Sequence, residues 1–305
     1  MAENESSRIE GFDGELDQVY YQRTWKDKSF FAFCRRFAKR RTALAGLCIL
    51  LILVICAVFA PIITPYDYTA VDPVNAYQRP SAQHIFGTDG LGRDLFTRVI
   101  YGGRYSLSIS LFSEGITLIL GIILGSCAGY FGGKTSSIIL RLCDILQSMP
   151  SILLAICVSV ALGGGVFPTI IALSISGIPS QTRMMRATML TVRNQEFVEA
   201  AQAIDCSKLA IIYKHVVPNC LAPSIVNSTM ALGTKIITSA SLSFLGLGIQ
   251  EPLPEWGALI SYGKDYFRYH PYLAIIPGIV IAICVMSYNL IGDGIRDALD
   301  PKLKS

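Results

Sequence analysis

The stretch EAAQAIDCSKLAIIYKHVVPN, residues 199–219, is a polar, helix-forming insert between strongly apolar segments. Apolar residues recur around its first half at the spacing of one helix face: Phe197, Ala200, Ala201 and Ile204. The second half repeats this spacing with Leu209, Ile212, Tyr213 and Val216, and we expect Pro218 to end it. The sequence therefore predicts two short amphipathic helices, joined at Asp205-Cys206 and projecting between membrane spans. Paired alanines on one face would let another protein approach closely, as in a docking element.

The insert resembles the "EAA" loop of permease subunits of ATP-binding-cassette (ABC) importers, through Glu199-Ala200-Ala201, the break four residues later, and His215-Val216-Val217-Pro218-Asn219. The resemblance implies that the loop contacts a cytoplasmic ATPase and transmits its motion. The implied coupling residues are Phe197, Glu199, Ala200, Ala201, Ile204, Asp205, Leu209 and Pro218. The family usually has glycine where this chain has Asp205, and aspartate is among the few residues that tolerate a positive φ. Asp205 or Ser207 could also cap the second helix.

Composition indicates a membrane protein rather than a soluble one. Of 305 residues, 52% are hydrophobic and 16% charged, with a mean hydropathy of +0.48, whereas globular chains carry about 25% charged residues. Residues 42–66 contain no charge, which is long enough for a helix to cross the bilayer. We expect an all-α integral membrane fold, and the resemblance implies the type I ABC importer permease kind. Its six transmembrane helices are expected at about 42–64, 105–130, 137–162, 168–188, 218–248 and 271–292.

The distribution of Lys and Arg predicts the orientation. With the N-terminus inside, the inner segments hold nineteen of these residues and the outer segments six, so both termini are expected to be cytoplasmic. Residues 1–41 form a cytoplasmic N-terminal tail and basic segment, and 42–305 the transmembrane permease domain. Within it, 65–104 is the outer loop and 189–217 the cytoplasmic coupling loop. The expected location is the bacterial cytoplasmic (inner) membrane, without a cleaved signal peptide.

Further blocks resemble the C-type subunits of dipeptide, oligopeptide and nickel importers: FGTDGLGRD at 86–94, SASLSFLGLG at 239–248, QEPLPEWG at 250–257 and NLIGDGIRDALDP at 289–301. The 86–94 block reads either as a structural turn with a local ion pair or as a contact for an extracytoplasmic binding protein. The segment around Trp256 could be a short helix against the pore mouth or part of an interfacial aromatic belt.

Ionisable residues inside expected spans are candidates for a transport pathway because burying them is costly. Glu114 lies in the second expected span and Lys235 in the fifth, and Ser239 occupies a position where relatives of the family resembled often carry Glu. Lys235 could face a water-filled pore beside the partner permease. It could equally pair with an acidic residue on another helix, for which Glu114 is a candidate, or snorkel towards the interface.

No catalytic residue set and no metal site is recognisable. The three histidines fall on separate segments, and no C-x-x-C pair occurs among the nine cysteines. Residues 129–135 end like a phosphate-binding loop, but Ala128 stands at the required leading glycine and an apolar span precedes it. We therefore expect a transport subunit that is not an enzyme and binds no cofactor itself.

The resemblance implies a permease that forms half of a translocation pathway for di- or oligopeptides. Its expected partners are a second homologous permease, two ABC ATPases that use ATP and Mg, an extracytoplasmic substrate-binding protein and membrane lipid, but no nucleic acid. A nickel or metal-chelate importer would share these patterns. An ion-driven secondary transporter is disfavoured because no internal repeat is found, and a membrane enzyme because no catalytic set is found.

Overall fold

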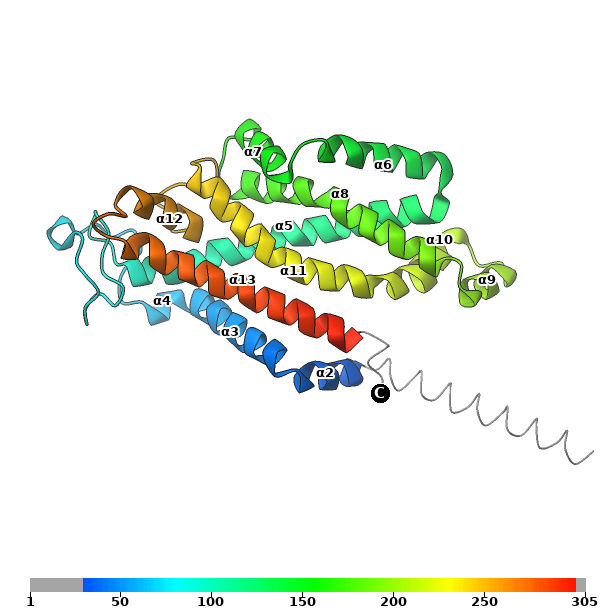
Figure 1. Cartoon of the computed structure of the whole chain (residues 1–305), viewed down its shortest axis with the longest axis horizontal. Helices are drawn as coiled ribbons and strands as arrows, with labels where there is room; N and C mark the ends of the chain where they lie inside the picture. The colour runs from blue at the N-terminus through cyan, green and yellow to red at the C-terminus, as the bar shows by residue number, and fades with distance from the viewer. Residues whose placement is uncertain (1–29, 300–305) are drawn as a thin grey trace, which may run out of the picture.

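Helices supply nearly all the regular structure of residues 30–299, the part of the chain that the computed structural model describes (Figure 1). They are α2 Phe30–Lys39, α3 Arg41–Val58, α4 Ala60–Ile63, α5 Leu95–Phe131, α6 Gly133–Gln147, α7 Ser151–Ala161, α8 Val166–Val192, α9 Glu196–Ala203, α10 Lys208–Ala210, α11 Val217–Phe244, α12 Trp256–Asp265 and α13 Tyr272–Leu299. A 3₁₀ turn spans Pro73–Asn75 and a π-helical turn Ile211–Val216. The expected N-terminal tail, residues 1–29, and the last six residues lie outside the described range.

Within the described residues, four helical stretches are long and apolar enough to cross a membrane: Arg41–Val58, Leu95–Phe131, Lys208–Phe244 and Tyr272–Leu299. The pair α6 and α7 meets the same standard together but is bent by 85°. The protein is thus an all-helical membrane protein with four to five candidate spans. The long helices lie side by side, with α9 and α10 at one end of the bundle and α12 at the other (Figure 1).

The span expected over residues 137–162 corresponds to a bent pair of helices in the structure. The structure has two helices there, α6 and α7, separated at Ser148–Pro150. Proline disfavours helical backbone at the preceding residue, here Met149, and it has no N–H to continue the helical hydrogen bonds. Gly163, Gly164 and Gly165 form the turn between α7 and α8, with φ angles of 90°, 70° and 100° that suit glycine.

The expected helix end at Pro218 is wrong, because the helix continues from Lys208 to Phe244. A π-helical turn over Ile211–Val216 precedes the proline, and the Val217 N–H donates to the Ile212 carbonyl five residues back. This wider turn accommodates a ring that would clash in a regular α-helix. The Asn219 side chain then donates to the His215 carbonyl at 2.6 Å. The coupling segment is therefore continuous with α11.

Close packing of α5 against α8 depends on glycine. Gly121, Gly125 and Gly129 repeat every fourth residue along α5 and meet Gln181, Met185 and Met189 of α8. A Cβ atom on Gly125 would lie 2.6 Å from the Met185 Cβ, closer than carbon atoms can approach. Small residues at this spacing let two membrane helices approach closely. The stripe therefore fixes the position of α8 beside α5.

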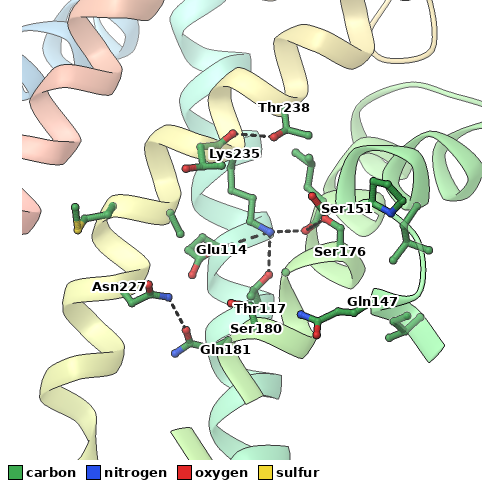
Figure 2. Close-up of a pocket in the computed structure, with 18 of the residues that line it drawn as sticks. Glu114, Thr117, Gln147, Ser151, Ser176, Ser180, Gln181, Asn227, Lys235 and Thr238 are labelled. Carbon is green, nitrogen blue, oxygen red and sulfur yellow. Dashed lines mark hydrogen bonds and ion pairs between the residues drawn. The ribbon is translucent and has the colours of Figure 1, made fainter. Parts of the chain in front are cut away.

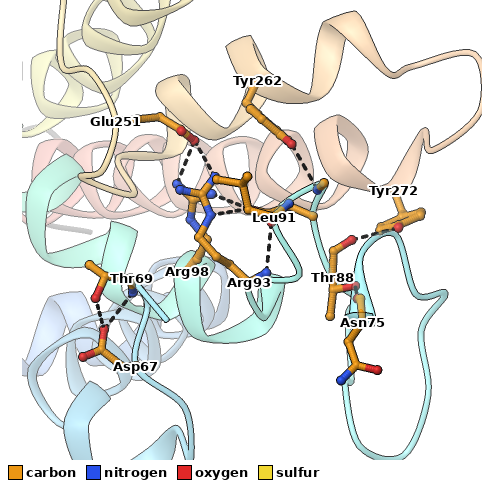
Figure 3. Close-up of polar contacts among 12 residues, drawn as sticks. Asp67, Thr69, Asn75, Thr88, Leu91, Arg93, Arg98, Glu251, Tyr262 and Tyr272 are labelled. Carbon is orange, nitrogen blue, oxygen red and sulfur yellow. Dashed lines mark hydrogen bonds and ion pairs between the residues drawn. The ribbon is translucent and has the colours of Figure 1, made fainter. Parts of the chain in front are cut away.

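The outer loop folds around buried charges (Figure 3). Asp94 caps α5 by accepting from the Thr97 backbone N–H at 2.8 Å, and its other oxygen is 2.8 Å from His84 Nδ1. Asp89 accepts from Arg93 and Arg98 at 2.7 and 2.6 Å. These contacts give the 86–94 block the structural role of a turn with a local ion pair. The helix that contains the second expected span, α5, begins at Leu95, ten residues before the expected start of that span.

The segment around Trp256 is a helix packed against α5. The Trp256 side chain is 2% exposed, and its indole N–H donates to the Val99 carbonyl at 2.9 Å. The interfacial-belt interpretation is therefore wrong for Trp256. Glu255 caps α12 through the Ala258 N–H at 3.0 Å, and burial raises the pKa of this carboxyl above its ordinary value.

Candidate functional site

A cavity with a volume of about 870 Å³ lies between α5, α8 and α11, beside the α6–α7 bend (Figure 2). Nine of its twenty lining residues are uncharged and polar: Thr117, Gln147, Ser151, Ser176, Ser180, Gln181, Asn227, Thr234 and Thr238. The charged residues of the lining are Glu114, Lys235 and Arg296. Hydroxyl and amide groups can both donate and accept hydrogen bonds, so the wall suits a hydrated or polar solute.

Lys235 and Glu114 form an ion pair in this wall (Figure 2). The Lys235 Nζ lies 3.9 Å from Glu114 Oε2 and 3.2 Å from Thr117 Oγ1, and it also donates to the Leu173 carbonyl. Among the described residues, Glu114 Oε2 has no hydrogen-bond partner. Lys235 therefore pairs with Glu114, one of the alternatives that the sequence allowed, and the same two residues line the cavity.

Ser239 is not part of this wall. It lies one turn beyond Lys235 on α11, is fully buried, and is not a lining residue of the cavity. Its hydroxyl has no hydrogen-bond partner among the described residues. Ser239 therefore lies outside this cavity, and its role in a transport pathway stays a prediction.

The cavity is closed at the α12 end of the bundle and extends towards the α9 end. Beyond Thr238, apolar side chains of α5, α7, α8, α11 and the loop after α11 pack into one cluster: Ile109, Ala155, Ala172, Leu173, Leu242 and Ile249. Towards the other end, a second pocket of about 310 Å³ shares Asn227 and Arg296 with the cavity. Asn227 donates to Gln181 Oε1 at 3.1 Å across this region.

The predicted coupling loop has one buried and one exposed side. Val198 and Ala201 are 0% and 4% exposed and pack on Met185, Met189 and the π-helical turn. Opposite, large apolar side chains are exposed: Phe197 at 37%, Ile204 at 76%, Leu209 at 71% and Tyr213 at 77%. We call these four residues the loop patch. Glu199, Ala200, Asp205 and Pro218 are exposed as well.

The sequence pattern placed Ala201 on the same helix face as Phe197 and Ile204. In the structure, Ala201 is buried, whereas Phe197 and Ile204 are exposed. The residue lies against the chain's own helices because the π-helical turn and α8 cover that side of α9. At the break, Asp205 has a φ of 56°, which confirms the expected positive-φ position. Of the two expected caps, Ser207 is the one used, since its hydroxyl accepts from the Ala210 N–H at 3.3 Å.

Comparison with known families shows to which protein family the chain belongs. Residues 118–305 match the family described as "binding-protein-dependent transport system inner membrane component", and residues 29–80 match the "N-terminal TM domain of oligopeptide transport permease C". The chain is a member of this permease family. It is a C-type transmembrane subunit of an ABC importer and is not itself catalytic.

Relatives match almost the whole permease. It is 42% identical over 271 residues to the dipeptide transport system permease protein of Alkalihalophilus pseudofirmus, covering 89% of each chain. It is 40% identical over 280 residues to the oligopeptide transport system permease protein of Bacillus subtilis, covering 92% and 90%. A glutathione transport system permease protein of Escherichia coli is 42% identical over 275 residues, covering 89% and 90%.

A solved structure supports the fold. An inward-facing methionine ABC transporter contains a chain that superposes with a TM-score of 0.55 at 21% identity, covering 68% of the permease and 98% of that chain. At this identity, the likeness concerns the fold alone. Membership of the family means that the permease works in a complex with ATPase and binding-protein partners. An ion-driven secondary transporter and a membrane enzyme are both excluded by this membership.

Sequence reasoning did not find several of the lining residues. Gln181 and Asn227, which meet across the cavity, and the hydroxyls of Ser176 and Ser180 carry no sequence signal of their own. Polar residues inside an expected membrane helix could have suggested them, because such residues usually face the bundle interior or a water-filled space.

Proposed function

We propose that this permease forms half of a translocation pathway for di- or oligopeptides. The observation that carries the proposal is the identity of 40–42% along about nine-tenths of the chain to relatives named for dipeptide, oligopeptide and glutathione transport. Glutathione is itself a small peptide. The polar cavity supports the proposal, since hydroxyl and amide side chains can bond the peptide groups that all such substrates share.

The proposal includes six spans, namely α3, α5, the bent pair α6 and α7, α8, α11 and α13. The helix α8 has 27 residues and so is about 40 Å long, enough to span although its polar residues lower its hydropathy. With the Lys- and Arg-rich segments inside, both termini are cytoplasmic. The permease then lies in the bacterial inner membrane, with α12 outside and α9 inside.

The proposed assembly contains a second homologous permease, which completes the cavity wall, and an extracytoplasmic binding protein, which delivers the substrate. Two ATPases bind ATP and Mg at their own sites, so this chain holds no cofactor. The loop patch is the contact for one ATPase. Its apolar residues are exposed at the inner end of the bundle, where an apolar surface suits a protein partner.

The packing of the loop supports a route for coupling. The buried side of α9 contacts Met185 and Met189 of α8, and α10 continues through the π-helical turn into α11. Both α8 and α11 line the cavity. A movement of the ATPase against the loop patch would therefore displace two of the helices that form the cavity wall.

The test is uptake by the complete importer, reconstituted in vesicles with ATP inside. We expect ATP-dependent uptake of a labelled peptide that the binding protein retains. Uptake of Ni²⁺ or a nickel chelate with no peptide uptake would contradict the peptide assignment and support the metal-importing alternative. Uptake without any ATPase would contradict the coupling proposal.

A further inference from the structure

Two buried arginines of the outer loop share two carboxylates (Figure 3). Arg93 and Arg98 each donate to Asp89 Oδ2, at 2.7 and 2.6 Å, and each donates to Glu251 Oε1, at 2.8 and 3.1 Å. The arginine side chains are 4% and 1% exposed. Arg98 Nε is buried and has no hydrogen-bond partner among the described residues. The two guanidinium groups thus present N–H donors to Asp89 and to Glu251, and we call this pair of arginines the fork.

The two carboxylates are held very differently. Asp89 is 1% exposed, and its Oδ1 accepts from the backbone N–H groups of Leu91 and Arg93 at 2.9 and 3.0 Å, so the turn itself fixes it. The Glu251 side chain is 40% exposed, and among the described residues its hydrogen bonds come from the two arginines alone. Glu251 is therefore the member of the cluster that can leave.

We propose that Arg93 and Arg98 form a carboxylate-binding site on the outer face, which the chain's own Glu251 occupies until an acidic side chain of the extracytoplasmic binding protein replaces it. The proposal rests on the binding-protein partnership of the permease family. It commits to one class of ligand, a protein carboxylate presented from outside.

A carboxylate is the expected ligand because it can take the place of the Glu251 carboxylate at the two arginines. Removing Glu251 alone would leave two buried guanidiniums with a single counter-charge, which is strongly unfavourable. An incoming carboxylate restores the charge balance and the charge-assisted hydrogen bonds. The Arg93 guanidinium also lies 5.8 Å from the centre of the Tyr262 ring, which helps to hold it in place during the exchange.

Release of Glu251 would affect the loop between α11 and α12. At its first end, this loop is attached to the α7–α8 turn, because the Gly248 carbonyl accepts from the Gly165 N–H at 3.2 Å. At its other end, the loop is held by Glu255, the buried cap of α12. Between these two points, the arginine contacts of Glu251 tie it to the start of α5. Docking of the binding protein would thus free the loop next to the apolar cluster that fills the outer side of the cavity.

The first test asks whether the fork accepts a free carboxylate. Thermal unfolding of the assembled transporter in detergent at pH 7 is measured in sodium acetate and in sodium chloride of equal ionic strength. We expect acetate to raise the unfolding midpoint of Glu251→Ala by about 2–4 °C in a saturable manner. The parent and Asp265→Ala, which removes an exposed acidic residue of α12, should not respond. An equal response, or none, in Glu251→Ala and Asp265→Ala would overturn the proposal without bearing on transport.

The second test asks whether Glu251 competes with the binding protein. Glu251→Gln and Asp265→Asn make the same change in net charge, so long-range electrostatics affects both. We expect Glu251→Gln to tighten binding of the binding protein about fivefold and Asp265→Asn to change it much less. If the two variants shift the dissociation constant equally, or if Glu251→Gln leaves it unchanged, Glu251 only holds the loop in place and the proposal is wrong. Because only binding is measured, this outcome would leave the proposed peptide uptake intact.

Discussion

The Lys235 ammonium lies 3.9 Å from the Glu114 carboxylate, across the contact of α11 with α5, with side chains only 8% and 5% exposed. The pair is nearly buried and yet belongs to the lining of the cavity between α5, α8 and α11. A role in the pathway and a role in helix packing therefore meet in the same two residues, and mutation can separate them.

Lys235→Met alone should prevent stable assembly, because it leaves the buried Glu114 charge unpaired, at a cost of about 3–5 kcal/mol. Replacing both partners, in Lys235→Met with Glu114→Leu, should recover much of the assembly. We expect the double variant to transport poorly per assembled complex, since the ion pair of the wall is gone. Folded complex and uptake are measured on the same membranes. Parental uptake per complex in the double variant would show that the pair is structural only.

Charges introduced on opposite sides of the coupling loop should have different consequences. Ile204→Asp places a charge on an exposed residue, so the permease should insert normally but lose ATPase association and coupled uptake. Ala201→Asp buries a charge against Met185 and Met189, at a cost of several kcal/mol, and should reduce the amount of folded permease. ATPase co-purification and permease abundance distinguish the two effects. Full ATPase association of Ile204→Asp would argue against the loop patch as a docking surface.

The glycine stripe of α5 predicts a position-dependent effect of alanine. Gly125→Ala places a Cβ 2.6 Å from the Met185 Cβ, and we expect a loss of about 1–3 kcal/mol of stability through overpacking. Gly115→Ala on the same helix meets nothing within 4 Å, so it should be neutral or slightly stabilising. The comparison of their thermal unfolding midpoints tests the closeness of α5 and α8. Similar midpoints for both variants would contradict the packing described.

The outer arginine cluster predicts a contribution of Glu251 to acid sensitivity. Burial raises the pKa of Glu251, but the Arg93 hydrogen bond and the charges of both arginines outweigh it, so the pKa lies below its ordinary value. Its stabilising contribution is therefore present above the pKa of the unfolded chain, near 4.5, and is lost as the pH falls through the lower pKa of the folded protein. Between pH 7 and pH 3, the parent should lose more stability than Glu251→Gln. Parallel pH profiles would show that Glu251 is not held by the arginines in solution.

Much of the candidate site could be predicted because its signals are local. The break at Asp205, with its positive φ, follows from a helix pattern interrupted by residues that tolerate it. Lys235 and Glu114 are conspicuous because charges are rare inside apolar segments. The helix through Pro218 could not be predicted, since proline normally ends a helix and only the π-helical turn before it removes the clash.

The sequence by itself determined that this chain is a helical membrane protein with a polar loop on its Lys- and Arg-rich side, because hydropathy, charge asymmetry and helix periodicity are properties of consecutive residues. Only the tertiary structure decided that Ala201 lies inward, that Lys235 pairs with Glu114, and that Glu251 joins arginines more than 150 residues away in the chain. These contacts depend on how the helices rotate and pack against one another, which the order of residues along one helix does not specify.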